Sequence, residues 1–436
     1  MIKVKAIKTY DAHEGGITKV VRQYLHHDGL ACKQSVLTED VSDFPCFGKF
    51  RLSEDNGKTY GEWQEIPKES TSIFFGNDEV VEIVDEQRGF KAWNPVHKHY
   101  VSTYFHRYFI DGHDAAYNAF WNGKLDGTRG FYDHQYVRIY KENASTHYAQ
   151  QFLRYEEGAD FDENNPRNPE FLLKNEGYIN PTIVLDNGDI MVAVGLKVST
   201  ACRMAGLDVE RVFPSAPFNF RALIVARGVF NKESELYDFT YSNPIILSDL
   251  QSSRGIDEPT VAQLKSGRIV VVMRGSNMQE KGWNTRIEKG APSFKWYSYS
   301  DDGGKTFVDP QPWHFDDGEV VYSSAAISDF VRLKKNGKLY WIGNVTTHQA
   351  YGNFPRYPLC IAEVDEQTGT PIKSTLTAID TRREGETEYV QLSNYWCLED
   401  RETGVLEIAL NKIGQFDASR PFYGEGWRYE LTFDEE

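Results

Sequence analysis

The chain has 436 residues and a formal net charge of −16, and no stretch approaches the ~18 apolar residues of a membrane span. This acidic balance argues against nucleic acid as a partner, because a surface that tracks phosphates needs an excess of Lys and Arg. The five Cys lack paired spacing, so neither a disulfide framework nor a structural zinc site is indicated. Aromatic residues make up 14% of the chain, which suits half-buried strands and surfaces that stack on sugars.

The N-terminal residues 1–16 mix charged and apolar residues, so we expect a first strand there and no signal peptide. As given, the sequence predicts a cytoplasmic protein without a membrane partner. Secretion stays open, because an export signal removed before residue 1 would not be visible. The sequence does not indicate an oligomeric state.

A phrase of apolar strand, glycine turn and apolar strand recurs around Gly188, Gly267, Gly337 and Gly404. The spacings from 188 to 267, 267 to 337 and 337 to 404 are 79, 70 and 67 residues. A four-stranded meander has roughly this length, so the chain accommodates about six such units. We therefore predict an all-β fold, a six-bladed β-propeller in a single domain over residues 1–436. Blade two falls in 97–150, the least regular stretch.

Two segments, Ser53–Tyr60 and Ser300–Phe307, share the pattern S-x-D-x-G-x-x-aromatic. In such a turn the Asp carboxylate accepts backbone N–H groups, the Gly adopts a left-handed conformation and the aromatic ring packs beneath. Residues 364–369 contain a partial third copy. These turns indicate an architecture and carry no chemistry of their own.

The segment 255–411 carries further motifs in a fixed order, namely Glu258-Pro-Thr-Val261, Leu264-Lys-Ser-Gly-Arg268, Met273-Arg274, the turn at 300–307, Arg356-Tyr-Pro-Leu359 and Ser393-Asn-Tyr395. Together with the turns, this order resembles the sialidase (BNR/Asp-box) superfamily, in particular its bacterial exo-sialidase-like glycoside hydrolase branch.

The resemblance implies roles for four residues. Tyr395 matches the family's nucleophile, and Glu258 matches the carboxylate that takes the Tyr proton. Arg274 and Arg356 match arginines that hold the carboxylate of an acidic sugar. Each residue also has an ordinary structural interpretation, as a core aromatic or as half of an ion pair between blades.

The acid that protonates the leaving oxygen is not marked by a motif. Asp114 is our candidate, because Gly112 suggests an exposed turn and His113 is a polar neighbour. Asp11 and Asp133 stay open as alternatives.

One family feature is missing. Where relatives carry an early Arg-x-Pro phrase, this chain has Asn180-Pro181, which favours an altered acidic sugar over sialic acid. Arg254 is a candidate replacement for that arginine. Trp283, on the long loop after Arg274, is a candidate to cover the sugar.

Nine of the 11 His precede residue 150. His97 and His99 place two imidazoles on one side of a strand, but no third ligand follows at metal spacing, so we predict no metal and no cofactor. His106 or His134, acting with Tyr395, would suit a different enzyme on uronic-acid polysaccharides, either a His/Tyr lyase or a rhamnosidase-like hydrolase.

The leading hypothesis is an exo-acting glycoside hydrolase that releases an acidic sugar, sialic-acid-like or uronic, from a glycan by a retaining Tyr-nucleophile mechanism. The lyase or rhamnosidase-like enzyme is one alternative. A non-catalytic carbohydrate-binding propeller is another. The sugar and its linkage stay open.

Overall fold

The computed structural model describes residues 1–40, 47–66, 73–75, 81–86, 91–121, 130–142, 146–178, 182–215, 218–277, 293–347 and 350–434. The chain divides into two compact units. Unit 1 comprises Met1–Glu69, Pro292–Phe294 and Trp313–Glu436, and unit 2 comprises Ser70–Ala291 and Lys295–Pro312.

The described strands form six antiparallel sheets, three in each unit. These sheets are the blades of a six-bladed β-propeller, so the predicted fold class is confirmed. Whether residues 1–436 behave as a single domain stays a prediction. None of the described helices has the length and apolar character needed to cross a membrane.

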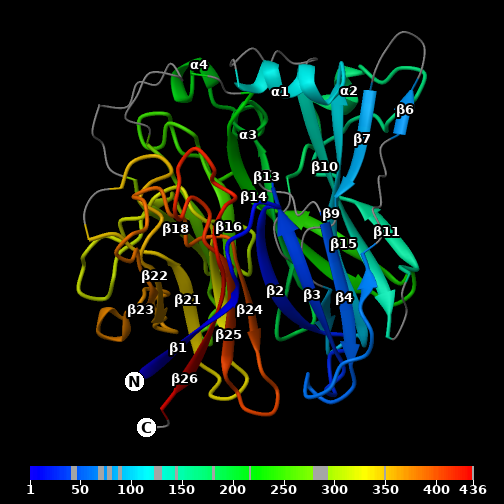
Figure 1. The fold of residues 1–436 in the computed structure, drawn as a ribbon. Coiled ribbons are helices and arrows are strands. Elements are labelled where there is room, and N and C mark those ends of the chain that lie inside the picture. Colours follow the sequence, from blue (N-terminus) through cyan, green and yellow to red (C-terminus); the bar gives the residue numbers. More distant parts are fainter. Residues whose placement is uncertain are drawn as a thin grey trace. The chain divides into compact units, whose positions relative to one another are not determined.

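Unit 1 holds three four-stranded blades. The first contains β2 (Ile17–Tyr24), β3 (Cys32–Glu39), β4 (Phe47–Ser53) and β5 (Gln64–Glu65). The second contains β20 (Ser328–Arg332), β21 (Leu339–Asn344), β22 (Leu359–Glu363) and β23 (Thr377–Asp380), with a 3₁₀ turn at Lys373–Thr375. The third contains β24 (Tyr395–Glu399), β25 (Leu406–Asn411), β26 (Gly426–Phe433) and the predicted N-terminal strand β1 (Ile2–Tyr10). The blue β1 lies antiparallel beside the red β26 in Figure 1, so both ends of the chain share one blade.

Unit 2 holds the other three blades and the four helices α1 (His113–Trp121), α2 (Pro169–Leu172), α3 (Val198–Ala205) and α4 (Val209–Val212). Its first blade contains β6 (Ile73–Phe75), β7 (Val81–Glu86), β8 (Ala92–Asn94), β9 (His99–Ile110), β10 (Gly130–Lys141) and β11 (Ala149–Phe152). Its second contains β12 (Thr182–Val184), β13 (Ile190–Lys197), β14 (Arg221–Asn231) and β15 (Leu236–Tyr241). Its third contains β16 (Asp257–Gln263), β17 (Ile269–Arg274), β18 (Lys295–Ser300) and β19 (Gln311–Pro312).

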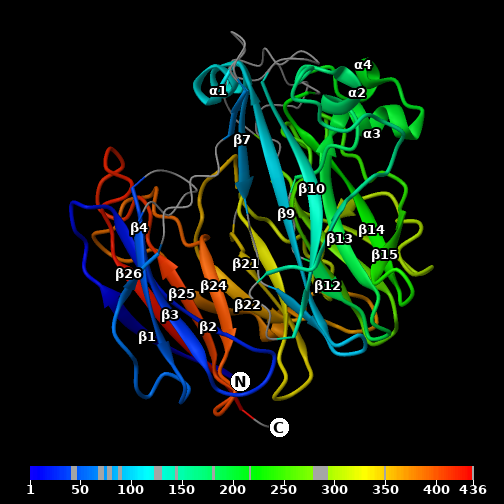
Figure 2. The same ribbon diagram turned by 90° about the vertical axis from the view of Figure 1, so that its right-hand side faces the viewer.

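The stretch at 97–150, which lacked clean hairpin signals, contains β9 and β10, each 12 residues long. Helix α1 follows β9 and lies at one end of this long strand pair (Figure 2). The hairpin signal is weak because a helix, not a tight glycine turn, joins the two strands.

The recurring glycines occupy the turns that join the first two strands of four blades. Gly188, Gly267, Gly337 and Gly404 have φ values of 87°, 88°, 67° and 68°. A residue with a Cβ adopts a positive φ only at a cost in free energy. This is why glycine recurs in the first turn of each of these four blades.

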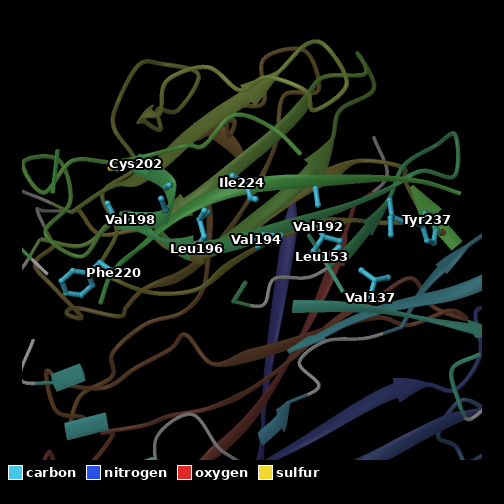
Figure 3. Close-up of a cluster of buried hydrophobic side chains, with 14 of the residues drawn as sticks. Val137, Leu153, Val192, Val194, Leu196, Val198, Cys202, Phe220, Ile224 and Tyr237 are labelled. Atoms are coloured by element: carbon cyan, nitrogen blue, oxygen red, sulfur yellow. The ribbon is translucent and has the colours of Figure 1, made fainter. Parts of the chain in front are cut away.

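A core of mostly aliphatic side chains packs the second blade of unit 2 against the first blade of that unit and against α3 (Figure 3). Every residue of β13 is buried, because both faces of this strand are covered. Val192, Val194 and Leu196 lie on one face of β13 and pack in the same cluster as Ile224 and Val137. Burial of such side chains contributes about 1.5–3 kcal/mol each.

The two serine turns have one hydrogen-bonding pattern. In the second, the Ser300 hydroxyl donates to Asp302 at 2.7 Å and accepts from Gly304 N at 2.8 Å. Asp302 accepts from the backbone N and hydroxyl of Thr306 at 2.9 and 2.6 Å. In the first turn, Ser53, Asp55, Gly57 and Thr59 repeat these bonds. Each turn therefore satisfies its own polar groups.

Replacement of Ser300 by Ala removes a buried hydroxyl that serves both a backbone donor and a carboxylate. We expect the free energy of unfolding to fall by about 1–2 kcal/mol. Urea unfolding of S300A beside the exposed-site control S234A measures this difference. Equal midpoints for the two variants would show that the turn does not depend on the serine.

Candidate functional site

A pocket of about 140 Å³ in unit 2 is lined by charged and aromatic side chains, and all three blades of that unit contribute to it. Its walls include Arg107, Phe131, Tyr178, Arg221, Arg254 and Asp257. We call it the arginine pocket. In a chain whose net charge is −16, several guanidinium groups around one pocket indicate a site for an anion.

The buried carboxylate of Asp133 holds two of these arginines. Asp133 on β10 lies directly opposite Arg107 on β9 and is 1% exposed. It accepts hydrogen bonds from Nε and Nη2 of Arg107 at 2.7 and 3.0 Å, and from Nη2 of Arg221 at 2.7 Å. The two-point bond fixes the plane of the Arg107 guanidinium, so the cations are oriented by the fold itself.

The pKa shifts of Asp133 and Arg107 both favour the ionised form. Burial alone would raise the pKa of Asp133, but the charges and hydrogen bonds of Arg107 and Arg221 hold that pKa below its ordinary value. Burial alone would lower the pKa of Arg107, but the charge and hydrogen bonds of Asp133 outweigh burial and raise that pKa. Each partner therefore stabilises the charge of the other.

A glycine brings Arg254 to the same pocket as Arg221. Gly255 has φ 65°, and a Cβ there would lie 2.3 Å from the carbonyl oxygen of Arg221. The next residue, Ile256, donates its N–H to that same oxygen at 2.7 Å. Only glycine permits this approach, which ties the loop that carries Arg254 to the start of β14.

Two adjacent carboxylates meet a fourth arginine beside the pocket. Arg274, at the end of β17, lies opposite Asp257 at the start of β16. Its Nη2 donates to Asp257 at 2.7 Å and its Nη1 donates to Glu258 at 2.7 Å. Since Asp257 lines the arginine pocket, this ion triad connects Glu258 and Arg274 to it.

Glu258 has a strained backbone. Its φ is 43°, it precedes Pro259, and the register of β16 against β17 shifts between Asp257 and Thr260. A non-glycine residue with positive φ costs about 1–3 kcal/mol and occurs most often at functional sites. The bulge allows two consecutive carboxylates to bind one guanidinium. In a regular strand these two side chains would point to opposite faces of the sheet.

Tyr178 is the only tyrosine among the wall residues just named, and cations surround it. The Arg221 guanidinium lies 4.6 Å from its ring centroid and that of Arg107 lies 5.6 Å away. Backbone bonds in both directions with Gly195 of β13 fix the residue. The hydroxyl of Tyr117, on α1, accepts a hydrogen bond from Arg107 at 3.3 Å, so α1 also contributes to the support of the pocket.

A second buried ion pair lies next to the Asp133 cluster. Lys197 and Glu176 are both buried and pair at 2.9 Å, and the Lys197 ammonium also donates to the carbonyl of Phe131. Burial raises the pKa of Glu176 and lowers that of Lys197, although each charge favours the other. The pair thereby anchors the backbone of a pocket-lining residue.

The structure brings together four of the residues proposed from sequence, namely Arg254, Arg274, Glu258 and Asp133. Arg254 lines the arginine pocket, and Arg274 and Glu258 join it through Asp257. Asp114 instead lies on α1 with a fully exposed side chain, 3.2 Å from the His113 ring nitrogen. Trp283 lies outside the described residues.

The two histidines of the lyase hypothesis stand in aromatic surroundings. His134 is fully buried and stacks on Phe171 at 4.1 Å, and burial lowers its pKa to about 3. His106 lies 5.5 and 5.0 Å from the rings of Tyr104 and Tyr136. A buried imidazole with so low a pKa is a poor proton acceptor near neutral pH.

Tyr395 and Arg356 belong to unit 1, where protein groups bond to the Tyr395 hydroxyl and to both Nη atoms of Arg356. The Tyr395 hydroxyl donates to the carbonyl of Ile342 at 2.9 Å, and burial raises its pKa well above the ordinary value. Arg356 donates to Gln391 at 2.7 Å and to the carbonyl of Ala325 at 2.6 Å. Asp11, an alternative acid, is exposed and pairs with Lys8.

Asp133, the other alternative acid, forms the buried ion cluster described above. Sequence reasoning named this residue but missed its partners, Arg107 and Arg221, and it missed Tyr178. One signal was present, because Arg107 and Asp133 are charged residues inside the apolar strands 99–110 and 130–141. A charge in such a strand requires a buried partner.

Within the part of the chain that the structure describes, no three His, Cys, Asp or Glu side chains gather to hold a metal ion. The rings of His97 and His99 lie 5.9 Å apart, and His99 hydrogen bonds to the hydroxyl of Tyr237 at 2.6 Å. Burial lowers the pKa of His99 to about 4.

Neither protein-family models nor curated proteins match this sequence, whereas solved structures do. A protein of unknown function from Dyadobacter fermentans aligns over 99% of both chains with a TM-score of 0.55 and 13% identity. Trypanosoma rangeli sialidase in complex with sialic acid aligns over 98% of this chain and 58% of its own, with a TM-score of 0.49 and 12% identity. The Fusarium graminearum α-L-arabinofuranosidase aligns over 98% and 97%, with a TM-score of 0.43 and 10% identity. The first of these likenesses shows a shared fold.

The pKa of His134 predicts a pH dependence of stability. Its folded value of about 3 lies below the ordinary value of 6.5, so only the unfolded chain takes up this proton as the pH falls through that window. This contribution to stability is therefore present above about pH 6.5 and is lost at up to ~1.4 kcal/mol per pH unit toward about pH 3.

We expect His134→Phe to reduce the slope of unfolding free energy against pH below about pH 6.5, measured by urea unfolding. The half-exposed His113→Gln is the matched control and keeps the wild-type slope. An unchanged slope in His134→Phe would contradict a neutral, buried imidazole.

Proposed function

We propose that the chain is a glycoside hydrolase whose arginine pocket binds the carboxylate of an acidic sugar. The observation that carries the proposal is the set of three guanidiniums, Arg107, Arg221 and Arg254, that line one pocket. Asp133 orients the first two, so the pocket presents preorganised donors to an anion. A planar fork of donors is the arrangement that best matches a carboxylate.

The size of the pocket supports action on a chain end. A volume of about 140 Å³ suits part of one sugar with its carboxylate and not an internal stretch of a polymer. Phe131 and Tyr178 supply apolar faces against which a sugar ring can pack. The substrate is thus a glycan that ends in an acidic sugar, and the reaction is exo-acting.

For the chemistry we propose Tyr178 as nucleophile in place of Tyr395, whose hydroxyl is hydrogen bonded within the core of unit 1. The Tyr178 oxygen attacks the anomeric carbon as Glu258 takes the phenolic proton, and the neighbouring guanidiniums stabilise the partial negative charge on that phenolic oxygen. Asp257 donates a proton to the leaving oxygen as that oxygen separates from the anomeric carbon. In the second step Asp257 takes a proton from water, the water oxygen displaces Tyr178 with net retention, and Glu258 returns the proton to the tyrosine. Arg274 positions both carboxylates.

The test measures turnover of methylumbelliferyl glycosides that carry glucuronic acid or N-acetylneuraminic acid beside neutral galactose and arabinofuranose. We expect turnover of an acidic glycoside only. Arg254→Ala should reduce its kcat/KM about 10²-fold or more through loss of a charge-assisted contact. Tyr178→Phe should abolish turnover while the acidic sugar still binds.

Arg268→Ala is the matched control, because Arg268 pairs with Asp301 near the surface and does not line the arginine pocket. Its kcat/KM should equal that of the wild type. Faster turnover of a neutral glycoside, or an Arg254→Ala variant as active as Arg268→Ala, would contradict the proposal.

A further inference from the structure

One buried lysine of unit 2 lies beside the arginine pocket, and the proposed reaction gives it no part. Lys197 is the last residue of β13, is 4% exposed and lies directly opposite Arg221 in the ladder of β13 and β14. An ammonium group held away from water costs free energy unless polar groups of the fold compensate its charge. The contacts of this group therefore show which parts of the structure it holds.

The Lys197 ammonium holds the backbone of the first aromatic wall of the pocket. Its Nζ donates to the carbonyl oxygen of Phe131 at 3.3 Å. The same Nζ lies 3.7 Å from the centre of the ring of Tyr132, the next residue of β10, and a cation over an aromatic face is attracted to it. Two consecutive residues of β10 are thereby bound to the end of β13.

The same ammonium reaches the second aromatic wall through a carboxylate. Nζ of Lys197 and Oε1 of Glu176 lie 2.9 Å apart, and Glu176 precedes Tyr178 by two residues. Between them, Gly177 donates its N–H to the carbonyl of Asp133 at 2.7 Å, and a Cβ at Gly177 would lie 2.7 Å from a side chain of β10. Because this segment is bound to β10 so closely, the position of Glu176 determines that of Tyr178.

Both walls contact one guanidinium of the pocket. The Arg107 guanidinium lies 4.7 Å from the centre of the Phe131 ring and 5.6 Å from that of the Tyr178 ring. The separation of the two rings therefore decides how closely a sugar can approach the N–H groups of Arg107. Lys197 is bound to the segments that carry both rings, and so it controls that separation.

We propose that Lys197 is a positioning residue, which keeps Phe131 and Tyr178 at the separation that a bound acidic sugar requires. The inference rests on the proposed function of the arginine pocket and adds to it a residue that does not touch the substrate. Without the ammonium, the segments that carry the two rings lose their common contact. Sugar binding would then have to order them, and the free energy of that ordering weakens the affinity.

Replacement of both partners in Lys197→Met/Glu176→Met separates the position of the walls from the stability of the fold. Removal of one partner leaves a buried charge uncompensated, whereas two apolar side chains of similar volume often maintain stability. We expect the double variant to unfold in urea close to the wild-type midpoint. Its dissociation constant for whichever of D-glucuronate and N-acetylneuraminate binds the wild type, measured by NMR titration, should rise about tenfold.

Lys412→Met/Glu386→Met is the matched control, because it removes another buried Lys–Glu pair, 2.8 Å long, from unit 1. It should bind the acidic sugar as the wild type does. Turnover adds a second readout, since one wall contacts the sugar and the other supplies the proposed nucleophile. For the methylumbelliferyl glycoside of the same acid, KM should rise and kcat should fall in Lys197→Met/Glu176→Met, and both should stay unchanged in the control.

Backbone hydrogen exchange, followed by mass spectrometry, reports on the walls without a sugar. Amides of residues 130–134 and 176–178 should exchange faster in Lys197→Met/Glu176→Met than in the wild type and in the control. Wild-type exchange and wild-type affinity in that variant would overturn the role of Lys197 and leave the proposed function intact. A wild type that binds neither acid would overturn the proposed function, and the role of Lys197 in sugar binding with it.

Discussion

The buried carboxylate of Asp133 is the contact on which the arginine pocket depends. One residue of β10 binds the guanidinium opposite it on β9 and a second guanidinium from β14 of the next blade. Two arginines that repel each other are thereby held at one pocket, where Asp133 and Arg107 are both buried. Removal of one partner from a buried ion pair costs about 3–5 kcal/mol, because the remaining charge is left without compensation.

The other parts of the pocket follow from this arrangement. The position of Arg221 determines that of Arg254, since Gly255 approaches the Arg221 backbone within a distance that excludes a side chain. The bulge of β16 turns Asp257 and Glu258 toward Arg274 at the cost of a positive φ. The strained backbone of Glu258 and the buried charge of Asp133 both cost free energy, and burial of the aliphatic core of unit 2 offsets this cost.

Local chemistry explains which features the sequence could predict. Two kinds of turn could be predicted, because each depends only on residues close together in the chain. They are the glycine turns at 188, 267, 337 and 404 and the two serine turns. The Glu258–Arg274 contact joins adjacent strands and is also local. In the Arg107–Asp133–Arg221 cluster, Arg107 and Asp133 face each other on adjacent strands, but Arg221 comes from a strand 88 residues further along the chain, and only the tertiary fold shows that it joins them. The sequence position of Tyr395 does not reveal that its hydroxyl donates to the carbonyl of Ile342, a contact with a different strand.

A double-mutant cycle of Asp133→Asn and Arg221→Met, measured as free energies of unfolding in urea, tests most directly whether Asp133 holds the pocket together. We expect each single substitution to destabilise the protein, and the double variant to be more stable than the sum of the two predicts, by about 1–3 kcal/mol. Effects that add to within about 0.5 kcal/mol would contradict the claim, because independent residues behave in that way.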